Sequence, residues 1–347
     1  MIFSNTLISW YLQNKRELPW RKTKNPYYIW ISEIILQQTR VDQGLNYYTQ
    51  FTRTFPTIFD LAKAKEETVL KLWQGLGYYS RARNLHFSAK YIVNELNGIF
   101  PTTYTEILKL KGVGDYTASA IASICYQEPT AVVDGNVYRV LSRYFAINTR
   151  TSSTEGIKAF KKLAQQLIDK KQPDTHNQAI MEFGAIQCKP KNPDCNACPL
   201  NTSCAALQKK IVDQLPVKGN PIKIKKRFFN YLVLTNPYNQ TNIYQRKLKD
   251  IWLGLYQFPL VETKKEVDKL ELTKTAQFDN YPTKSFKISL FNEESIVHKL
   301  SHQHLYVKFW ILHTQEKLKQ PVTWSEFKNY PVPILIENFV KEFKPKP

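Results

Sequence analysis

Residues 188–204 read CKPKNPDCNACPLNTSC, and this stretch holds four of the five cysteines of the 347-residue chain. The four cysteines follow the spacing C-x6-C-x2-C-x5-C and are Cys188, Cys195, Cys198 and Cys204. The prolines and short polar residues between them predict a loop that turns four thiolates towards one centre. Four thiolates suit a tetrahedral zinc ion or an iron–sulfur cluster. Zinc ribbons usually carry two C-x2-C pairs, whereas this segment carries one, and a pair of disulfides is the remaining alternative.

The length and charge of the chain point to two domains that contact a polyanion. A chain of 347 residues has room for two hydrophobic cores. The formal net charge is +20, with 25 Lys+Arg against 16 Asp+Glu in residues 1–205 and 24 against 13 in residues 206–347. Both parts are therefore basic, as expected of proteins that bind nucleic acid. A general excess of lysine in the source organism is the alternative explanation.

The N-terminus gives no indication of export. It lacks the basic start, the apolar stretch and the cleavage site of a signal peptide, and no apolar run approaches the length of a membrane span. We therefore expect a cytoplasmic protein without a membrane partner. A reducing compartment disfavours disulfides in the cysteine segment, and we expect the fifth cysteine, Cys125, to pack in the core.

The first part of the chain has helical patterning throughout. Asn25 and Pro26 form a helix N-cap followed by proline at the first helical position, and residues 27–51 keep apolar residues at helical spacing. Similar patterns recur as far as residues 176–186, separated by Gly, Pro and Asn breaks. These features predict an all-α domain over residues 1–205, ending with the cysteine segment.

The chain changes in character after the last clustered cysteine. Residues 206–225 mix Lys, Pro and Gly without a clear period, which is typical of a linker. The runs FFNYLVLTN (228–236) and LYVKFWILH (305–313) are typical of strands. We predict a multidomain chain with an all-α domain, a linker over residues 206–225 and a smaller α+β domain over residues 226–347.

Residues 110–125, LKGVGDYTASAIASIC, predict the end of one helix, a tight turn and the start of another helix. The turn contains Gly112 and Gly114, which allow the backbone to approach a phosphate group closely. The amides at the start of the second helix point towards such a group. On its own, a plain interhelical turn explains this spacing equally well.

Two carboxylates stand out by their surroundings in the sequence. Glu33 lies within an apolar helical stretch, where burial would raise its pKa and make it a general acid; an exposed surface glutamate is the alternative. Asp134 precedes the helical pattern of VVDGNVYRV, where helix amides would keep it ionised; a simple N-cap is the alternative. One protonated and one ionised carboxylate is the arrangement that cleaves glycosidic bonds.

Five motifs occur in one order along the chain: SEIILQQTR, GLGYYSRARNL, LKGVGDYTASAI, VVDGNVYRVL and the cysteine segment. Together they resemble the helix-hairpin-helix DNA glycosylases with an iron–sulfur cluster, and among them the MutY family of adenine glycosylases. The basic C-terminal part is similar to the Nudix-like domain of that family, so the resemblance covers nearly the whole chain. The segment KKEVDKLEL (264–272) lacks the acidic pattern of a hydrolytic Nudix helix, which implies a binding domain without pyrophosphatase activity.

The resemblance implies a base excision repair enzyme. It implies hydrolysis of the N-glycosidic bond of adenine mispaired with 8-oxoguanine or guanine in double-stranded DNA, by a monomer associated with the nucleoid. The adenine would be flipped out of the duplex into the active site. One alternative is an oxidised-pyrimidine glycosylase and lyase of the endonuclease III kind. Another is a DNA-binding protein in which the carboxylates have no catalytic role.

The same resemblance assigns roles to individual residues. Glu33 would protonate adenine, Asp134 would stabilise the oxocarbenium-like sugar and Asn136 would help to organise the site. Tyr116 stands where the related lyases have a lysine, which implies a monofunctional glycosylase with Tyr116 assisting. The four clustered cysteines match the ligands of a [4Fe–4S] cluster.

The remaining assignments concern contacts with DNA. Residues expected in the adenine pocket are Trp20, Arg21 and Gln178. Residues expected to fill or probe the duplex around the opposite base are Gln38, Thr39, Leu76 and Tyr78. Gly112 and Gly114 would approach the DNA backbone, and Ser301 and His302 match a loop that detects 8-oxoguanine. The preceding residue of that loop is Leu300, where the family has a phenylalanine.

Overall fold

The computed structural model describes residues 2–217, 219, 223–279 and 285–343, so residues 218 and 220–222 of the predicted linker and the last four residues of the chain lie outside it. The chain divides into two compact units. One unit contains residues 1–63 and 84–220, and the other contains residues 64–83 and 221–347. Segment 64–83 thus groups with the C-terminal residues, an association that its local helical pattern does not indicate.

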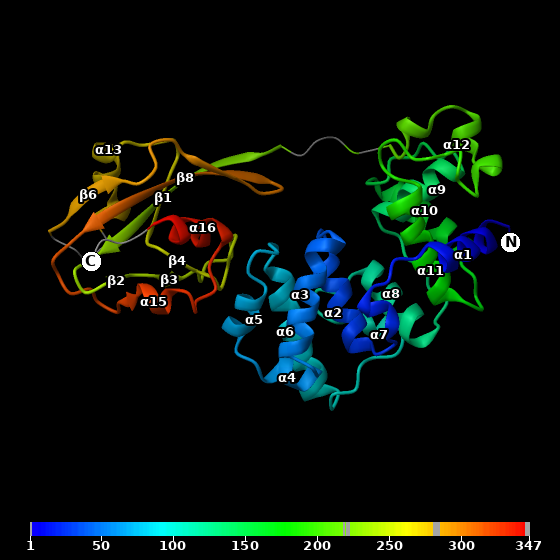
Figure 1. The fold of residues 1–347 in the computed structure, drawn as a ribbon, viewed down its shortest axis with the longest axis horizontal. Coiled ribbons are helices and arrows are strands. Elements are labelled where there is room, and N and C mark those ends of the chain that lie inside the picture. The colour runs from blue at the N-terminus through cyan, green and yellow to red at the C-terminus, as the bar shows by residue number, and fades with distance from the viewer. Residues whose placement is uncertain (1, 218, 220–222, 280–284, 344–347) are drawn as a thin grey trace. The chain divides into compact units, whose positions relative to one another are not determined.

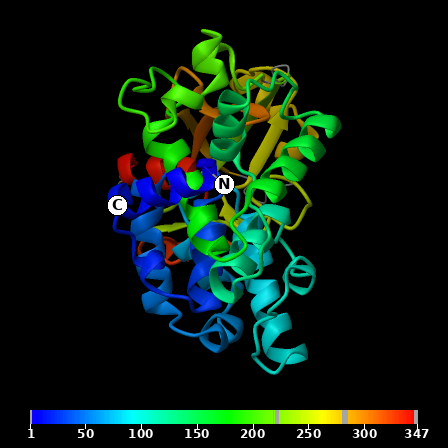
Figure 2. The same ribbon diagram turned by 90° about the vertical axis from the view of Figure 1, so that its right-hand side faces the viewer.

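The first unit is helical (Figure 1 and Figure 2), as the sequence predicts. Its helices are α1 (Ile2–Asn14), η1 (Pro19–Lys22), α2 (Pro26–Leu36), α3 (Val41–Thr54), α4 (Ile58–Lys63), the greater part of α6 (Ser80–Glu95), α7 (Tyr104–Ile107), α8 (Asp115–Tyr126), α9 (Gly135–Tyr144), α10 (Thr154–Leu167), α11 (Pro173–Glu182), the π-helical η2 (Phe183–Gln187), η3 (Asn201–Ser203), α12 (Ala205–Gln208) and η4 (Val212–Gln214). Helix α2 packs against α3 and α8, and α11 packs against α1, α8 and α9. None of the helices in the described ranges combines the length and apolar character needed to span a membrane.

Helix α2 begins as the sequence predicts. The side chain of Asn25 accepts a hydrogen bond from Tyr27 N at 3.0 Å, and Pro26 occupies the first turn. The helical pattern of residues 27–51 is nevertheless divided in two, because Gln38 adopts a left-handed backbone conformation (φ 57°) that ends the first helix. The resulting turn leads directly into α3.

The second unit is built on a mixed sheet (Figure 1). Its elements are α5 (Glu66–Leu72), β1 (Lys225–Thr235), β2 (Gln240–Thr241), β3 (Tyr244–Gln245), β4 (Tyr256–Gln257), β5 (Leu260–Thr263), α13 (Lys269–Thr273), α14 (Ala276–Asp279), β6 (Lys287–Leu290), β7 (Ile296–Lys299), β8 (Gln303–His313), β9 (Val322–Thr323), α15 (Trp324–Phe327) and α16 (Ile334–Glu342). The main sheet has the order β5-β1-β8-β6, and β7 also pairs with β8. The long strands β1 and β8 run parallel in register, whereas the other pairs of this sheet are antiparallel.

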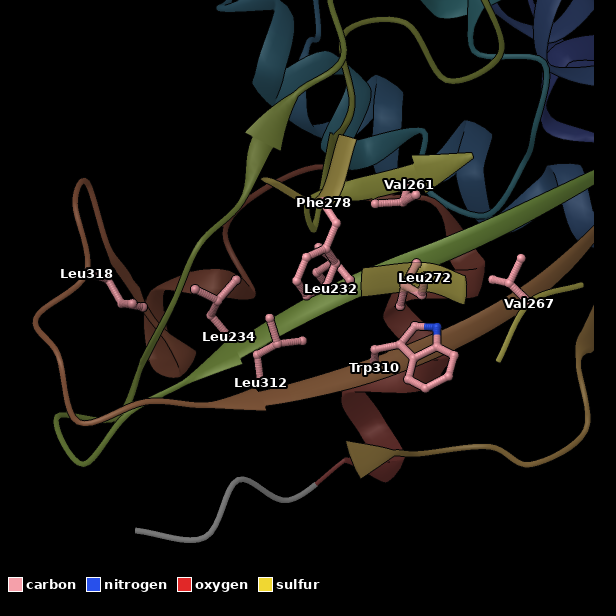
Figure 3. Close-up of a cluster of buried hydrophobic side chains, with 9 residues drawn as sticks. All are labelled: Leu232, Leu234, Val261, Val267, Leu272, Phe278, Trp310, Leu312 and Leu318. Carbon is pink, nitrogen blue, oxygen red and sulfur yellow. The ribbon is translucent and has the colours of Figure 1, made fainter. Parts of the chain in front are cut away.

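Alternate residues of β1 and β8 form two different cores. On one face lies the cluster in Figure 3, which α13 and α14 help to cover: Leu232, Leu234, Val261, Val267, Leu272, Phe278, Trp310, Leu312 and Leu318. On the other face, Tyr231 stacks on Phe309 at 5.4 Å, and Phe309 stacks on Phe339 of α16 at 4.0 Å. Helices on both faces of the sheet confirm the predicted α+β class of this unit.

Candidate active site

A cavity of about 600 Å³ lies in the helical unit, lined by residues of α2, α8, α9 and α11. This volume lies within the usual range for small-ligand sites. The residues predicted for catalysis and for the adenine pocket all line it: Trp20, Arg21, Glu33, Tyr116, Asp134, Asn136 and Gln178. The fold therefore brings together side chains that lie up to 158 positions apart in the sequence.

Glu33 lies on α2 and is only 8% exposed. Burial raises the pKa of this carboxyl to about 7, although a hydrogen bond from Tyr116 opposes the rise. A carboxyl with such a pKa is present in both protonation states at neutral pH. Glu33 can therefore donate a proton and later accept one, as a general acid and base does.

Tyr116 occupies the second position of α8 and places its hydroxyl between two partners. The hydroxyl lies 3.2 Å from Met181 Sδ and within hydrogen-bonding reach of Glu33, so its one proton can be donated to either partner. Burial and the neighbouring Glu33 raise the pKa of Tyr116 well above its usual value. Tyr116 is therefore a neutral donor and carries no amine that could attack a sugar.

Asp134 is the N-cap of α9. Its Oδ1 accepts hydrogen bonds from Asn136 N at 2.9 Å and Val137 N at 2.8 Å, and its Oδ2 accepts one from Asn136 Nδ2 at 2.8 Å. The sequence predicts that these groups keep the carboxylate ionised, but burial outweighs them and raises the pKa of Asp134. Asp134 therefore caps α9 and also lines the cavity. The low polarity that raises the pKa also strengthens any attraction between an ionised Asp134 and a cationic sugar.

Arg139 of α9 also contacts this site, although the motifs do not predict a role for it. It donates from Nε to Cys188 O at 2.8 Å and from Nη2 to Asn136 Oδ1 at 2.8 Å and Gly184 O at 2.6 Å. Asn136 in turn holds Asp134, so Arg139 joins the start of the cysteine segment to the carboxylate of the cavity. Its position within VVDGNVYRV, three residues after Asn136, is the only sequence signal for this role.

Arg21 is held by a buried carboxylate that the sequence did not indicate. Glu182 is 1% exposed at its side chain and pairs with Arg16 at 2.7 Å and Arg21 at 2.8 Å. Burial would raise the pKa of Glu182, but hydrogen bonds from Arg16 and Arg21 hold it at about 2. The permanently ionised Glu182 fixes Arg21 at the wall of the cavity.

The other two predicted pocket residues are also held by neighbours. Gln178 accepts a hydrogen bond through Oε1 from the Tyr11 hydroxyl at 3.1 Å, which leaves its amide NH2 group for other partners. Trp20 is buried and meets Tyr48 edge to face at 5.1 Å. Both side chains line the cavity in defined orientations.

The residues predicted around the opposite base fall in two places. Thr39 lines the cavity of the helical unit, and Gln38 is exposed in the turn beside it. In the second unit, a separate cavity of about 390 Å³ is lined by Leu76, Tyr78, Ser301 and His302. The hydroxyl groups of Tyr78 and Ser301 are hydrogen-bonded to each other. The second unit therefore joins residues from two motifs that lie more than two hundred positions apart.

The two glycines of the α7–α8 turn differ in their surroundings. Gly112 has φ +83°, and a Cβ atom there would lie 2.6 Å from Asn84 Cβ. Gly114 has an ordinary φ of −99°, and a Cβ atom there would meet nothing within 4 Å. Gly112 is required by the fold, whereas the open space at Gly114 lies at the N-terminus of α8, where backbone amides face outwards.

The four clustered cysteines line one cavity, and all five cysteines of the chain are free. Burial raises the pKa of Cys198 to about 11, and burial with nearby sulfurs raises that of Cys195. Four thiolates would therefore need compensating positive charge at this place, which bound metal supplies. In the described part of the chain, no group of three or more His, Cys, Asp or Glu is arranged to hold a single metal ion. The four thiols that line this cavity are nevertheless the type of ligand that iron–sulfur clusters require.

Two acidic residues of KKEVDKLEL stabilise the local structure of this segment. Asp268 and Glu271 form a capping box at the start of α13, and Glu271 also pairs with Lys265 at 2.7 Å. Asp268 and Glu271 therefore both have local partners in the structure.

Comparisons with known proteins agree with this arrangement. A model of the HhH-GPD superfamily of base excision DNA repair proteins matches residues 31–166, and a NUDIX domain model matches residues 230–342. The solved structure of a thermostable thymine-DNA glycosylase is 30% identical with a TM-score of 0.56, over 60% of this chain and 96% of that chain. An endonuclease III–DNA complex, at 23% identity and a TM-score of 0.53, shares the helical fold over 60% of this chain and 95% of that one.

Relatives of this chain are named adenine DNA glycosylases. That of Buchnera aphidicola subsp. Baizongia pistaciae is 37% identical over 90% of this chain and 86% of its own length. That of Buchnera aphidicola subsp. Schizaphis graminum is 34% identical over 94% of each chain. The human enzyme is 46% identical over 63% of this chain and 42% of its own length. Because such similarity extends over nearly the whole chain, the chain belongs to the adenine DNA glycosylase (MutY) family of base excision repair enzymes.

Proposed function

We propose that this adenine DNA glycosylase acts on adenine that faces 8-oxoguanine or guanine in double-stranded DNA. The observation that carries the proposed chemistry is that two carboxylates, the buried Glu33 and the half-buried Asp134, line the same cavity. The volume of this cavity suits a single base that has been flipped out of the duplex. The net charge of +20 supports binding to the DNA backbone.

Each carboxylate has a distinct task in this proposal. Glu33, with its pKa of about 7, donates a proton to the leaving adenine and then takes one from the attacking water. Asp134 stabilises the positive charge that develops on the sugar, while Asn136 and the amides of α9 hold its oxygens in place. Trp20, Arg21 and Gln178 bind the base.

The enzyme is proposed to be monofunctional. A lyase needs an amine that forms a Schiff base with the opened sugar, and Tyr116 offers only a neutral hydroxyl beside Glu33. The rival function is that of an endonuclease III-like glycosylase and lyase, whose fold the helical unit shares.

The second unit is proposed to bind the base opposite adenine. Support comes from the 390 Å³ cavity, where Ser301 and His302 lie beside Leu76 and Tyr78. Their hydroxyl, imidazole and phenol groups can form hydrogen bonds with atoms that distinguish 8-oxoguanine from guanine. Because one chain carries both cavities, we propose that a monomer is sufficient for recognition and excision.

The cysteine segment is proposed to bind a [4Fe–4S] cluster. Support comes from four free cysteines around one cavity and from the guanidinium of Arg143, whose Nη1 lies 3.5 Å from Cys188 Sγ. When bound, the cluster would tie Cys188, Cys195, Cys198 and Cys204 into one rigid loop. Iron and acid-labile sulfide analysis of anaerobically purified protein should give about four of each per chain. One zinc per chain and no iron would contradict this proposal.

One assay tests substrate and reaction type together. The protein is incubated with duplexes containing adenine opposite 8-oxoguanine, adenine opposite guanine, or thymine glycol, and products are separated with and without alkali. We expect alkali-labile sites in the two adenine duplexes, faster with 8-oxoguanine, and little direct strand cleavage. Strong cleavage of the thymine glycol duplex without alkali would favour the endonuclease III-like function.

A further inference from the structure

One aromatic residue of the second cavity has an unusual backbone conformation. Trp252 has a φ of +60°, in the left-handed region that bulky residues rarely occupy. Such a conformation persists only where surrounding contacts fix it, and it is enriched at functional sites. The side chain is 9% exposed and lines the cavity together with Leu300, Ser301 and His302.

Arginine side chains hold the backbone on both sides of Trp252. Arg83 Nη1 donates to Leu253 O at 2.6 Å, and Arg246 Nε donates to Ile251 O at 2.9 Å. Asp250, two residues before Trp252, pairs with Arg246 at 2.8 Å. Because Arg83 lies on α6, close in sequence to Leu76 and Tyr78, it connects the Trp252 loop to the other wall of the cavity.

The Arg227 side chain also contacts the same loop. It pairs with Asp250 at 2.8 Å, is 10% exposed at its side chain, and also donates to Gln303 Oε1 at 3.3 Å. Gln303 lines the cavity and begins β8. Asp250 and its partners thus join the loop to the central strands of the sheet.

The indole ring is itself oriented by aromatic neighbours. Its centroid lies 5.8 Å from that of His298 and 6.3 Å from that of Phe229, which it meets edge to face. Leu300 is aliphatic and offers no planar surface to this cavity. Tyr78 contributes a ring, but its hydroxyl is engaged with Ser301. The cavity therefore combines polar groups on one segment with a fixed indole on another.

We propose that Trp252 is the aromatic contact surface of the opposite-base cavity, against which a purine facing adenine packs. A planar indole supplies dispersion and stacking with any purine, so it accounts for affinity, while polar groups such as Ser301 account for the choice between 8-oxoguanine and guanine. This inference rests on the proposed role of the second unit in binding the opposite base. It assigns to Trp252 the stacking function that Leu300 lacks.

The test compares duplexes that differ only opposite adenine. Each duplex carries 2′-fluoro-2′-deoxyadenosine, which resists hydrolysis, opposite 8-oxoguanine, guanine or a tetrahydrofuran abasic site. Dissociation constants are measured at fixed salt for wild type, Trp252→Leu and Trp252→Phe. Trp252→Leu should weaken binding roughly tenfold for both purine duplexes and leave the abasic duplex unchanged, because no base is present to stack. Trp252→Phe keeps a smaller ring that can still stack, so it should weaken binding of the purine duplexes only a few-fold.

Trp324→Leu is the matched control, since Trp324 packs on Phe258 and Phe327 and does not line this cavity. Melting temperatures are compared for all variants. If Trp252→Leu unfolds, Trp252→Phe provides the test. Its dissociation constants should rise a few-fold for the two purine duplexes and stay unchanged for the abasic duplex. An equal loss on all three duplexes, or no loss on any, would overturn the role of Trp252. A wild type that binds all three duplexes equally would instead overturn the proposed function of the second unit.

Discussion

The guanidinium of Arg139 donates a hydrogen bond of 2.8 Å from Nη2 to the side-chain oxygen of Asn136. The same guanidinium donates from Nε to Cys188 O at 2.8 Å, and Asn136 donates to Asp134 Oδ2 at the same distance. A continuous series of hydrogen bonds therefore runs from the first clustered cysteine to a carboxylate of the cavity. The cysteine segment contributes in this way to the position of Asp134.

Replacing Arg139 by lysine should reduce excision while leaving the protein folded. Lysine keeps the positive charge but loses the planar fork that reaches Asn136 and Cys188 together. We expect single-turnover excision of adenine to fall by roughly 10- to 100-fold. Arg143→Lys is the comparison variant, because the Arg143 donors reach Cys188 Sγ, Lys189 O and Pro190 O but make no hydrogen bond with Asn136 or Asp134. Equal loss of excision per iron-containing molecule in both variants would contradict a specific role for Arg139.

The burial of Glu33 predicts a pH-dependent stability difference. Its pKa is about 7 in the folded protein against an ordinary 4.5, so the folded state binds more protons between these values and wild-type stability falls as the pH rises through that window. The loss should reach roughly 3 kcal/mol. Glu33→Gln removes the ionisation. The melting temperature of the variant minus that of wild type should therefore rise between pH 4.5 and pH 7 and stay constant above pH 7. A difference that does not vary with pH would show that Glu33 is not buried as a titrating group.

The two glycines of the α7–α8 turn should respond differently to alanine. Gly112→Ala meets Asn84 and an unfavourable φ, so it should lower the free energy of unfolding by roughly 1–3 kcal/mol. Gly114→Ala has room and an ordinary φ, so its stability should stay within about 0.5 kcal/mol of wild type. If a DNA phosphate approaches Gly114, only this variant should bind DNA several-fold more weakly without losing stability. Unchanged DNA affinity of Gly114→Ala would exclude a close backbone contact there.

A substitution at position 116 can introduce the amine that the wild-type tyrosine lacks. Tyr116→Lys places an amine in the cavity beside Glu33, where it could form a Schiff base with the sugar of an abasic site. Borohydride should then trap more covalent protein–DNA complex than with wild type. Tyr116→Phe serves as the control that removes the hydroxyl alone. Equal trapping by wild type and Tyr116→Lys would mean that another group acts as the nucleophile.

The sequence predicts the site well where one motif carries both the residue and its surroundings. Glu33 lies among apolar residues of its own helix, a pattern that left a buried and an exposed glutamate open, and the structure buries it. Asp134 precedes a helix that it caps, as expected. The capping amides lower the pKa of Asp134 as expected, but burial outweighs them, and desolvation depends on elements that pack from elsewhere in the chain.

Long-range pairs could not be predicted in the same way. Glu182 meets Arg16 across 166 positions, and no local pattern selects this partner among the acidic residues of the chain. Segment 64–83 reads as an ordinary helical stretch, yet Gln74 Nε2 donates to Glu337 at 2.7 Å and Lys71 Nζ donates to Tyr330 O at 3.0 Å. These contacts depend on tertiary packing, which helical periodicity does not encode.

The role of Glu33 in excision is the central claim, and one comparison tests it most directly. Adenine release from a duplex with adenine opposite 8-oxoguanine is measured in single turnover for wild type and Glu33→Gln, with binding measured on the same duplex. We predict that Glu33→Gln binds within a few-fold of wild type and releases almost no adenine, because glutamine preserves the size of the side chain but cannot transfer a proton. Adenine release by Glu33→Gln at a rate near that of wild type would contradict the account.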